Sequence, residues 1–194
     1  GLYEATKHTV SELALTSAYK LKDFAAACAA LLGFPFKIIG ADESFNLAFT
    51  SDANFDGTES IREALNAIAE ATQTIYFIDS QWTLTFKRLD INGEPVYDIT
   101  KDCYYALKSG ENRRLAAICH ATELGDNITA SLSVSGTTQY IRNNPFWELR
   151  EDVADLVDSA LAAIGGITIN QFECSWRGNF LLEIGDKINL ITKD

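Results

Sequence analysis

The stretch D-A-N-F-D-G-T-E-S-I-R-E, residues 52 to 63, carries the most specific chemical pattern in the chain. It matches every fixed position of a calcium-binding loop of the EF-hand type, in which carboxylate and amide oxygens surround the ion and a final glutamate closes the site. The matching residues are Asp52, Asn54, Asp56, Gly57 and Glu63. Taken alone, this pattern predicts a calcium site.

The residues on either side of this loop favour a different interpretation. An EF-hand needs a helix before the loop, but the apolar side chains from Phe45 to Phe49 recur at a spacing of two, which is typical of a strand. After the loop, Ser60 and Glu63 form an S-x-x-E capping box, which predicts the start of a helix without any metal. We favour this turn and capped helix. A calcium-dependent binding module that uses Asp52 to Glu63 is kept as an alternative.

The sequence holds no convincing set of catalytic side chains. It has two histidines, His8 and His120, so any arrangement of nucleophile, base and orienting group must use one of them. Cys119 precedes His120, but neighbours on a strand point to opposite faces and cannot share a proton. We expect His120 to be a partly exposed strand residue. Because G-x-S-x-G, H-E-x-x-H and phosphate-binding glycine loops are also missing, we predict no catalytic, cofactor-binding or metal-binding residues.

The charge balance limits the classes of partner. The chain has 27 Asp and Glu against 16 Lys and Arg, a net charge of -11, which repels phosphate backbones and disfavours specific nucleic-acid binding. No window approaches the roughly 20 apolar residues of a membrane span, and the first thirty residues lack the pattern of a signal peptide. The chain of 194 residues begins at Gly1 and has no Met. We therefore interpret it as a soluble internal fragment, with Gly1 as a candidate remainder of a cleaved tag.

Three other groups of side chains are given structural roles. The cysteines form no C-x-x-C pair and are predicted to be buried free thiols: Cys28, Cys103, Cys119 and Cys174. The tryptophans are predicted to be core or interface anchors: Trp82, Trp147 and Trp176. Three acidic residues are placed on the solvated face of a helix: Asp152, Asp155 and Asp158.

The spacing of apolar residues predicts three helices. The first covers 21–32 and is ended by Gly33 and Pro35, while the residues before it, 13–19, alternate and favour an extended segment. The second begins after Ser60 and continues to about Ala71. The third covers about 148 to 164, and its apolar face extends from residue 153 onward.

Alternating and apolar runs predict the strands. They cover 38–39, 45–49, 115–121, 128–134, 167–176 and 187–192, and a hairpin joins 74–79 to 82–89. The mixture predicts an α+β fold. The turn-like residues 91–95 suggest a boundary between a small α+β domain of two helices plus a hairpin, 1–92, and a β-rich domain, 93–194, which carries the helix at about 148–164.

Two segments resemble a known family. The helix S-I-R-E-A-L-N-A-I-A-E-A-T with the hairpin Y-F-I-D-S-Q-W-T-L-T-F resembles the helix-hairpin of tail-tip hub proteins from long-tailed bacteriophages and prophages. The end of the chain, from N-N-P-F-W through the last helix to F-E-C-S-W-R-G-N-F-L-L-E-I-G-D-K-I-N-L, is similar to the same family, whose turn reads G-[ND]-P-x-L-E-x-G-D. Phe180 stands at the usual proline position. The matching residues are Gly178, Asn179, Leu182, Glu183, Gly185 and Asp186.

The resemblance covers most of the chain and implies a structural role. It implies that 93–194 is a barrel-like hub domain and that 1–92 is an α+β domain inserted into the hub. It further implies a trimeric baseplate hub at the tail tip that contacts distal-tail and tape-measure proteins, serves tail assembly, host attachment and the DNA channel, and resides in the virion tail after production in the host cytoplasm. An acidic channel lining would let DNA pass without holding it. The alternative is the non-catalytic part of a tail-linked peptidoglycan endopeptidase.

The family turn also has a local physical interpretation. Gly178 and Gly185 permit the backbone geometry of a sharp reversal, and replacing Gly185 with Val should destabilise the fold if its φ is positive. Leu181, Leu182 and Ile184 are predicted to anchor the turn to the core.

Overall fold

The fold contains both helices and strands, so the predicted α+β class is confirmed. The computed structural model describes residues 2–13, 19–49, 55–90, 92–122, 127–148 and 150–191. In this part of the chain the α-helices are α1 (Leu21–Leu31), α2 (Asp42–Phe45), α3 (Ile61–Thr72) and α4 (Val153–Ile164). Two short 3-10 turns, Glu4–Thr6 and Val10–Glu12, precede them. None of the helices described is long and apolar enough to cross a membrane.

Local sequence signals place the helices α1 and α3 correctly. The helix α1 ends just before Gly33, whose φ is +77°. At the start of α3, the Glu63 carboxylate accepts a hydrogen bond from the Ser60 backbone N–H at 2.8 Å, and the Ser60 hydroxyl accepts one from the Glu63 N–H at 3.3 Å. The predicted capping box is therefore confirmed, and it satisfies backbone donors that a helix start otherwise leaves free.

The third predicted helix begins later than expected. The helix α4 starts at Val153, whereas the sequence predicted a start near 148. The backbone N–H groups of Trp147 and Glu148 both donate to the carbonyl of Asn144, so this segment forms a separate turn that does not continue into α4. On α4 the predicted solvated face is confirmed, because Asp155 and Asp158 are exposed.

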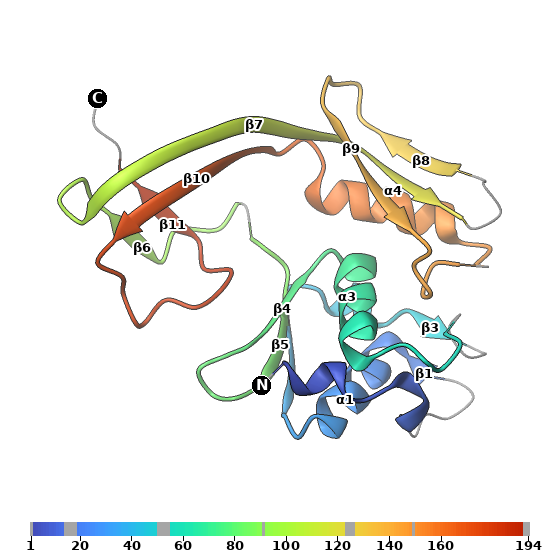
Figure 1. The fold of residues 1–194 in the computed structure, drawn as a ribbon. Coiled ribbons are helices and arrows are strands. Elements are labelled where there is room, and N and C mark those ends of the chain that lie inside the picture. The colour runs from blue at the N-terminus through green and yellow to red at the C-terminus, as the bar shows by residue number, and fades with distance from the viewer. Residues whose placement is uncertain are drawn as a thin grey trace.

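A three-stranded sheet forms the centre of the first part of the chain. It consists of β2 (Phe36–Ile39), β5 (Leu84–Lys87) and β4 (Ile75–Ile78) in that order, with β5 parallel to β2 and antiparallel to β4. The predicted hairpin is thus confirmed. In Figure 1 this sheet lies beside α1 and α3, below the longer strands of the second part.

The predicted strand over 45–49 is mostly wrong. Residues 42–45 form the short helix α2, and the extended part is limited to β3 (Ala48–Phe49), which pairs with β1 (Tyr19–Lys20). Phe45 lies on α2 and packs its ring against Phe86, with centroids 5.3 Å apart. Phe49 stacks on Tyr19 at 5.4 Å. The spacing of two over 45–49 therefore does not reflect one strand, because Phe45 on α2 and Phe49 on β3 reach the core from different elements.

The second part of the chain is built on one long strand. The strand β7 (Tyr104–Ala121) has 18 residues; its first half pairs with β10 (Thr168–Trp176), and its second half lies between β8 (Asn127–Ser131) and β9 (Thr137–Arg142). Near the chain's end β11 (Ile188–Leu190) runs parallel to β6 (Tyr97–Ile99). The sequence predicted only 115–121 of β7 and neither β6 nor β9. The barrel-like form and the boundary at residue 92 stay predictions.

The core crosses the junction between the two parts of the chain. Phe146, which follows β9, inserts its ring edge-on among Phe24, Phe49 and Phe55 at centroid distances of 5.2 to 5.5 Å. Two residues before it, the side-chain amide of Asn144 donates to the carbonyl of Ala67 and to the Glu70 carboxylate. The N-N-P-F-W segment is therefore the point where the β7–β9 layer is joined to α3.

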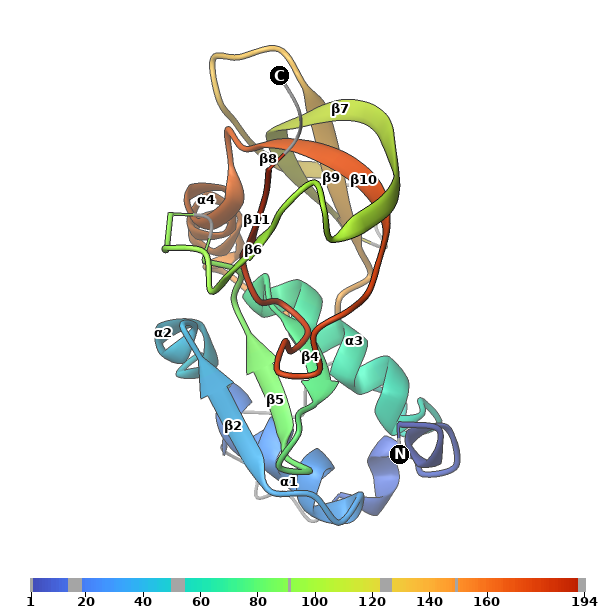
Figure 2. The same cartoon turned by 90° about the vertical axis from the view of Figure 1, so that its left-hand side faces the viewer.

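The turn between β10 and β11 is only partly as expected. Gly178 and Gly185 have φ values of +78° and +80°, which fits the sharp reversal that the two glycines were expected to permit. The predicted apolar anchoring is wrong for Leu181 and Ile184, which are exposed, while Leu182 is half-buried. Figure 2 shows that this turn reaches down to the β4–β5 hairpin, where polar side chains hold it, as described below.

Gly185 provides the first test. We expect Gly185→Val to lower the free energy of unfolding by about 1–3 kcal/mol through backbone strain, and further because a Cβ there would lie 2.8 Å from Ile75 Cδ1. Gly178→Val is the matched control, since its φ is similar but a Cβ there meets nothing within 4 Å. Urea unfolding of both variants should therefore show the larger loss for Gly185→Val. Equal losses would rule out the close contact as a cause. An unchanged free energy of unfolding for Gly185→Val would contradict both the backbone strain and the close contact.

Candidate functional site

The candidate calcium loop uses its described carboxylates for local hydrogen bonds. Asp56 Oδ1 accepts from the Thr58 N–H at 2.7 Å and from its hydroxyl at 2.6 Å, and these bonds hold the pKa of Asp56 below its usual range. The bonds from Ser60 lower the pKa of Glu63 in the same way. Asp52 and Asn54 lie outside the described residues, so the calcium alternative stays untested.

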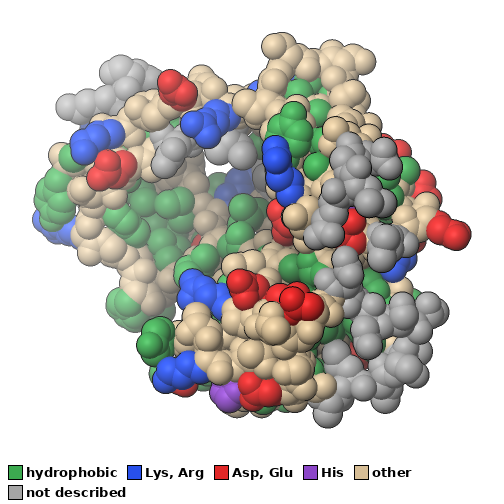
Figure 3. Space-filling view, turned by 45° about the vertical axis from the view of Figure 1, so that its right-hand side comes forward, with side chains coloured by type: hydrophobic (Ala, Val, Ile, Leu, Met, Phe, Trp, Pro, Cys, Tyr) green, Lys and Arg blue, Asp and Glu red, His purple; other side chains and the backbone are tan. Residues whose placement is uncertain are grey.

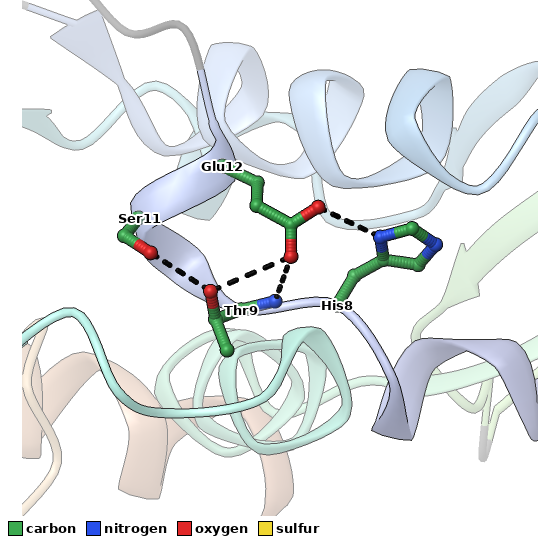
Figure 4. A network of polar contacts seen from close by, with 4 residues as sticks. All are labelled: His8, Thr9, Ser11 and Glu12. Carbon is green, nitrogen blue, oxygen red and sulfur yellow. Dashed lines mark hydrogen bonds and ion pairs between the residues drawn. The ribbon is translucent and has the colours of Figure 1, made fainter.

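His8 belongs to a capping network at the start of the second 3-10 turn. Its Nδ1 lies 2.8 Å from Glu12 Oε2, while Glu12 Oε1 accepts from the Thr9 N–H at 2.8 Å. The hydrogen bond from His8 is the largest cause of the lowered pKa of Glu12. Figure 4 shows Ser11 bonded to Thr9 on the side of Glu12 away from the His8 ring. These four residues form a cap, and they lack the order of a catalytic triad.

The expectation that His120 is partly exposed is wrong. Its side chain is fully buried, because this half of β7 lies between β8 and β9 and packs against α4. The imidazole lies edge-on to the Trp147 ring at 5.7 Å, and its Nε2 is 3.6 Å from Glu148 Oε1, which is longer than a hydrogen bond. Cys119 Sγ instead lies 3.9 Å from the side chain of Asn127, so His120 and Cys119 do not form a nucleophile–base pair.

The cysteines and tryptophans divide between core and surface. All four cysteines are free thiols, as predicted; Cys28 and Cys119 are buried, while Cys103 and Cys174 are partly exposed. Burial raises the pKa of the Cys28 thiol to about 12, which keeps it unreactive. Trp147 is buried in the core as expected, but Trp82 is exposed and is no core anchor.

The strongest candidate for a functional surface is apolar and lies at the end of the molecule that carries β6 and β11. Large hydrophobic side chains are exposed there, and we call this set the β6–β11 surface. Its members are Val96, Tyr105, Phe180, Leu181, Ile184, Ile188 and Ile191. Figure 3 shows hydrophobic side chains gathered at the left of the view, over this end of the molecule. Exposed apolar patches on a soluble domain typically mark sites of protein association.

Polar contacts hold the turn that carries Phe180, Leu181 and Ile184 of this surface. The Ser80 hydroxyl donates to Glu183 Oε1 at 2.5 Å, and Lys87 Nζ lies 2.9 Å from Asp186 Oδ1. Lys187 Nζ also donates to the carbonyl of Gly93. Because these groups fix the turn without its apolar side chains, Phe180 and Leu181 remain 96% and 73% exposed.

The first half of β7 gives the same end of the molecule a second unusual feature. In the described part of the chain, residues 104–114 pair on one side only, with β10. Most side chains of this half are exposed. A ribbon of two strands with both faces in water is marginal by itself and gains stability from further contacts. This surface therefore combines free strand edges with exposed apolar side chains.

Sequence reasoning missed this surface. The run F-L-L-E-I between Gly178 and Gly185 was interpreted as an anchor because apolar residues are usually buried. The available signal was its position: an apolar run between two reversal-forming glycines, with Glu183 inside it and Asp186 directly after it, can be held by these carboxylates while its apolar side chains face outward.

The fold is shared with solved structures of phage and prophage tail proteins. A tail protein from Neisseria meningitidis MC58 aligns with a TM-score of 0.59 at 13% identity, covering 96% of this chain and 61% of that chain. The 43 kDa tail protein of prophage MuSo2 from Shewanella oneidensis gives 0.59 at 12% identity, covering 99% and 62%. The prophage tail protein gp18 from Listeria monocytogenes EGD-e gives 0.52 at 15%, covering 98% and 60%.

These likenesses confirm the predicted resemblance at the level of the fold. The chain spans about three fifths of the length of each of these structures. No protein-family model matches the chain, and no curated protein sequence is similar to it.

The Lys87–Asp186 pair provides a test with a defined pH dependence. The Glu183 N–H and the Lys87 ammonium hold the pKa of Asp186 below its ordinary value of 3.8. A depressed folded-state pKa stabilises the protein above the unfolded-state value, and this stabilisation is lost as the pH falls through the folded-state pKa. We expect Asp186→Asn to cost about 1–2 kcal/mol at neutral pH, and less at the most acidic pH at which the wild type still folds.

Urea unfolding of the wild type and of Asp186→Asn, at neutral pH and at that acidic pH, measures how much stability the substitution costs at each pH. Asp158→Asn, on the exposed face of α4, is the control and should change neither value appreciably. A cost for Asp186→Asn that stays constant down to acidic pH would contradict the ion pair as its origin.

Proposed function

We propose that this chain is a structural part of a phage or prophage tail, placed at the tail tip as a section of the baseplate hub. The observation that carries the proposal is the β6–β11 surface, an exposed apolar area on a fold shared with three tail proteins. A protein that acts only as a monomer gains nothing from such a surface, whereas a subunit of an assembly buries it.

Phe180 is the principal anchor of this proposed interface. Its side chain is almost completely exposed, while the turn beneath it is fixed by Glu183 and Asp186. An aromatic side chain held by a rigid turn loses little conformational freedom when it binds, so more of its burial appears as affinity. Such a residue is suited to filling a pocket on another subunit.

The one-sided pairing of β7 supports association with further copies. A second copy, or a strand of another tail protein, would cover the open edge of residues 104–114. In the intact tail we propose a homotrimer that contacts the distal-tail and tape-measure proteins and takes part in tail assembly and host attachment. A net charge of -11 is compatible with a place beside a DNA channel, because an acidic wall repels the passing phosphates.

A structural role also agrees with the chemistry of the two histidines. His8 forms part of a cap, and His120 is buried beside Trp147 without a nucleophile at hydrogen-bond distance among the described residues. We therefore propose that the chain has no hydrolytic activity of its own.

The proposed interface is tested by removing its anchors. We expect the double variant Phe180→Ser, Leu181→Ser to associate about 30-fold or more weakly than the wild type, because truncating interface anchors costs about 2 kcal/mol or more. Analytical ultracentrifugation over a concentration series measures this. Tyr140→Ser is the matched control, since Tyr140 is exposed on β9 at the other end of the molecule (Figure 1). Equal association of all three proteins would contradict the assigned surface.

The location is tested on phage particles. Antibodies raised against the chain should label the tail tip in negative-stain electron microscopy, and label on the capsid or on no particle would contradict the placement. Incubation of the purified chain with peptidoglycan should release no muropeptides. Their release, absent from a heat-denatured control, would overturn the purely structural role.

A further inference from the structure

A cavity of about 430 Å³ lies between α3 and the 143–148 segment. One wall comes from the exposed and half-buried side of α3, including Glu63 and Glu70, and the opposite wall comes from Asn144 and Glu148. Phe55 and Glu59 close one end. A cavity of this size is within the range that holds small ligands or a single inserted side chain.

The cavity has an acidic lining. Four carboxylates contribute to its walls, and among the residues that the structure describes neither lysine nor arginine does. Carboxylates that share one concave, partly dry space repel each other, and a positive group placed among them is attracted by all of them. The overall charge of -11 adds to this attraction.

The Glu148 side chain gives an independent sign of a missing partner. The residue is 9% exposed and lines the cavity. Its Oε1 is buried and receives no hydrogen bond from the described residues, because His120 Nε2 is 3.6 Å away. A buried acceptor without a donor costs free energy, which a ligand that brings N–H groups would recover.

Two of the other carboxylates are fixed by hydrogen bonds from the backbone. The Glu59 carboxylate accepts from the N–H groups of Asp56 and Gly57, each at 3.0 Å, and Glu63 accepts from Ser60. These bonds orient the acidic groups before any ligand arrives, so binding would not have to order them. Such preorganisation is typical of a binding site.

Glu70 lies deeper in the same wall. Its Oε2 accepts a hydrogen bond from the Asn144 side-chain amide at 2.9 Å. Burial raises the pKa of Glu70, because the charged form loses solvation. A cation bound in the cavity would restore the lost stabilisation of that charge.

We propose that this cavity binds an organic cation, a guanidinium or ammonium group whose N–H donors reach Glu148 and Glu70. Within the described residues no three His, Cys, Asp or Glu side chains are placed to hold a metal ion. Phe55 adds an aromatic ring at one end of the cavity, and aromatic rings attract such cations. This inference does not depend on the proposed role in a phage tail.

Two probes distinguish the possible sources of the cation. N-acetyl-arginine amide represents the side chain of a partner protein, and 1,4-diaminobutane represents a free amine. N-acetyl-citrulline amide has the same shape as the first probe but no charge. Isothermal titration at about 0.15 M salt, where contacts at the exposed surface are screened, should show saturable binding of at least one cation and at least tenfold weaker binding of the citrulline probe.

Variants and mapping complete the test. We expect Glu148→Gln and Glu70→Gln each to weaken binding at least tenfold, while Glu111→Gln, on the exposed first half of β7, removes the same charge and leaves binding unchanged. Amide chemical shifts of the wild type should move at Ala67 and Asn144. If Glu148→Gln does not fold, Glu70→Gln and this mapping decide. Equal binding of citrulline, no saturable binding of either cation, or shifts elsewhere would overturn the proposal.

Discussion

The insertion of Phe146 into the aromatic cluster of the first part of the chain is the contact on which the rest of the arrangement depends. Phe146 touches rings from α1, β3 and the segment before α3, and Asn144 fixes the same backbone to α3 through two hydrogen bonds. This places the β7–β9 layer beside α3. The acidic cavity exists because the segment bearing Phe146 also presents Asn144 and Glu148 to that helix. The core contact and the cavity therefore have one structural cause.

A second contact of a different kind positions the other end of the molecule. The turn after β10 is joined to the β4–β5 hairpin by Glu183 and Asp186, whose partners are Ser80 and Lys87. Aromatic packing excludes water and leaves no apolar side chain free, whereas these polar contacts leave Phe180 and its neighbours free to face outward. Apolar packing therefore joins the two parts of the chain at Phe146. Polar contacts hold the turn after β10, whose apolar side chains stay exposed and available for association.

How much of this could be predicted from the sequence depends on how local each cause is. The helices α1 and α3 and the β4–β5 hairpin were predictable, because capping, a terminal glycine and apolar spacing act within a few residues. The first half of β7 was not, because both of its faces are exposed and its residues carry no period. His120 is buried by strands and a helix that come later in the chain. The cavity could not be predicted either, since Glu70 and Glu148 meet only through the tertiary contact of Phe146.

The net charge of -11 has a different meaning once the positions of the carboxylates are known. Several of them accept hydrogen bonds from nearby backbone N–H groups, as Glu12, Asp23 and Glu63 do, so their negative charge stabilises turns and helix starts. Charge used in this way says little about a DNA channel. The carboxylates around the acidic cavity differ, because tertiary packing brings Glu70 and Glu148 toward the two that the backbone already holds. Their mutual repulsion is tolerated because aromatic packing at Phe146 holds the walls together, which leaves a concave negative site suited to a cation.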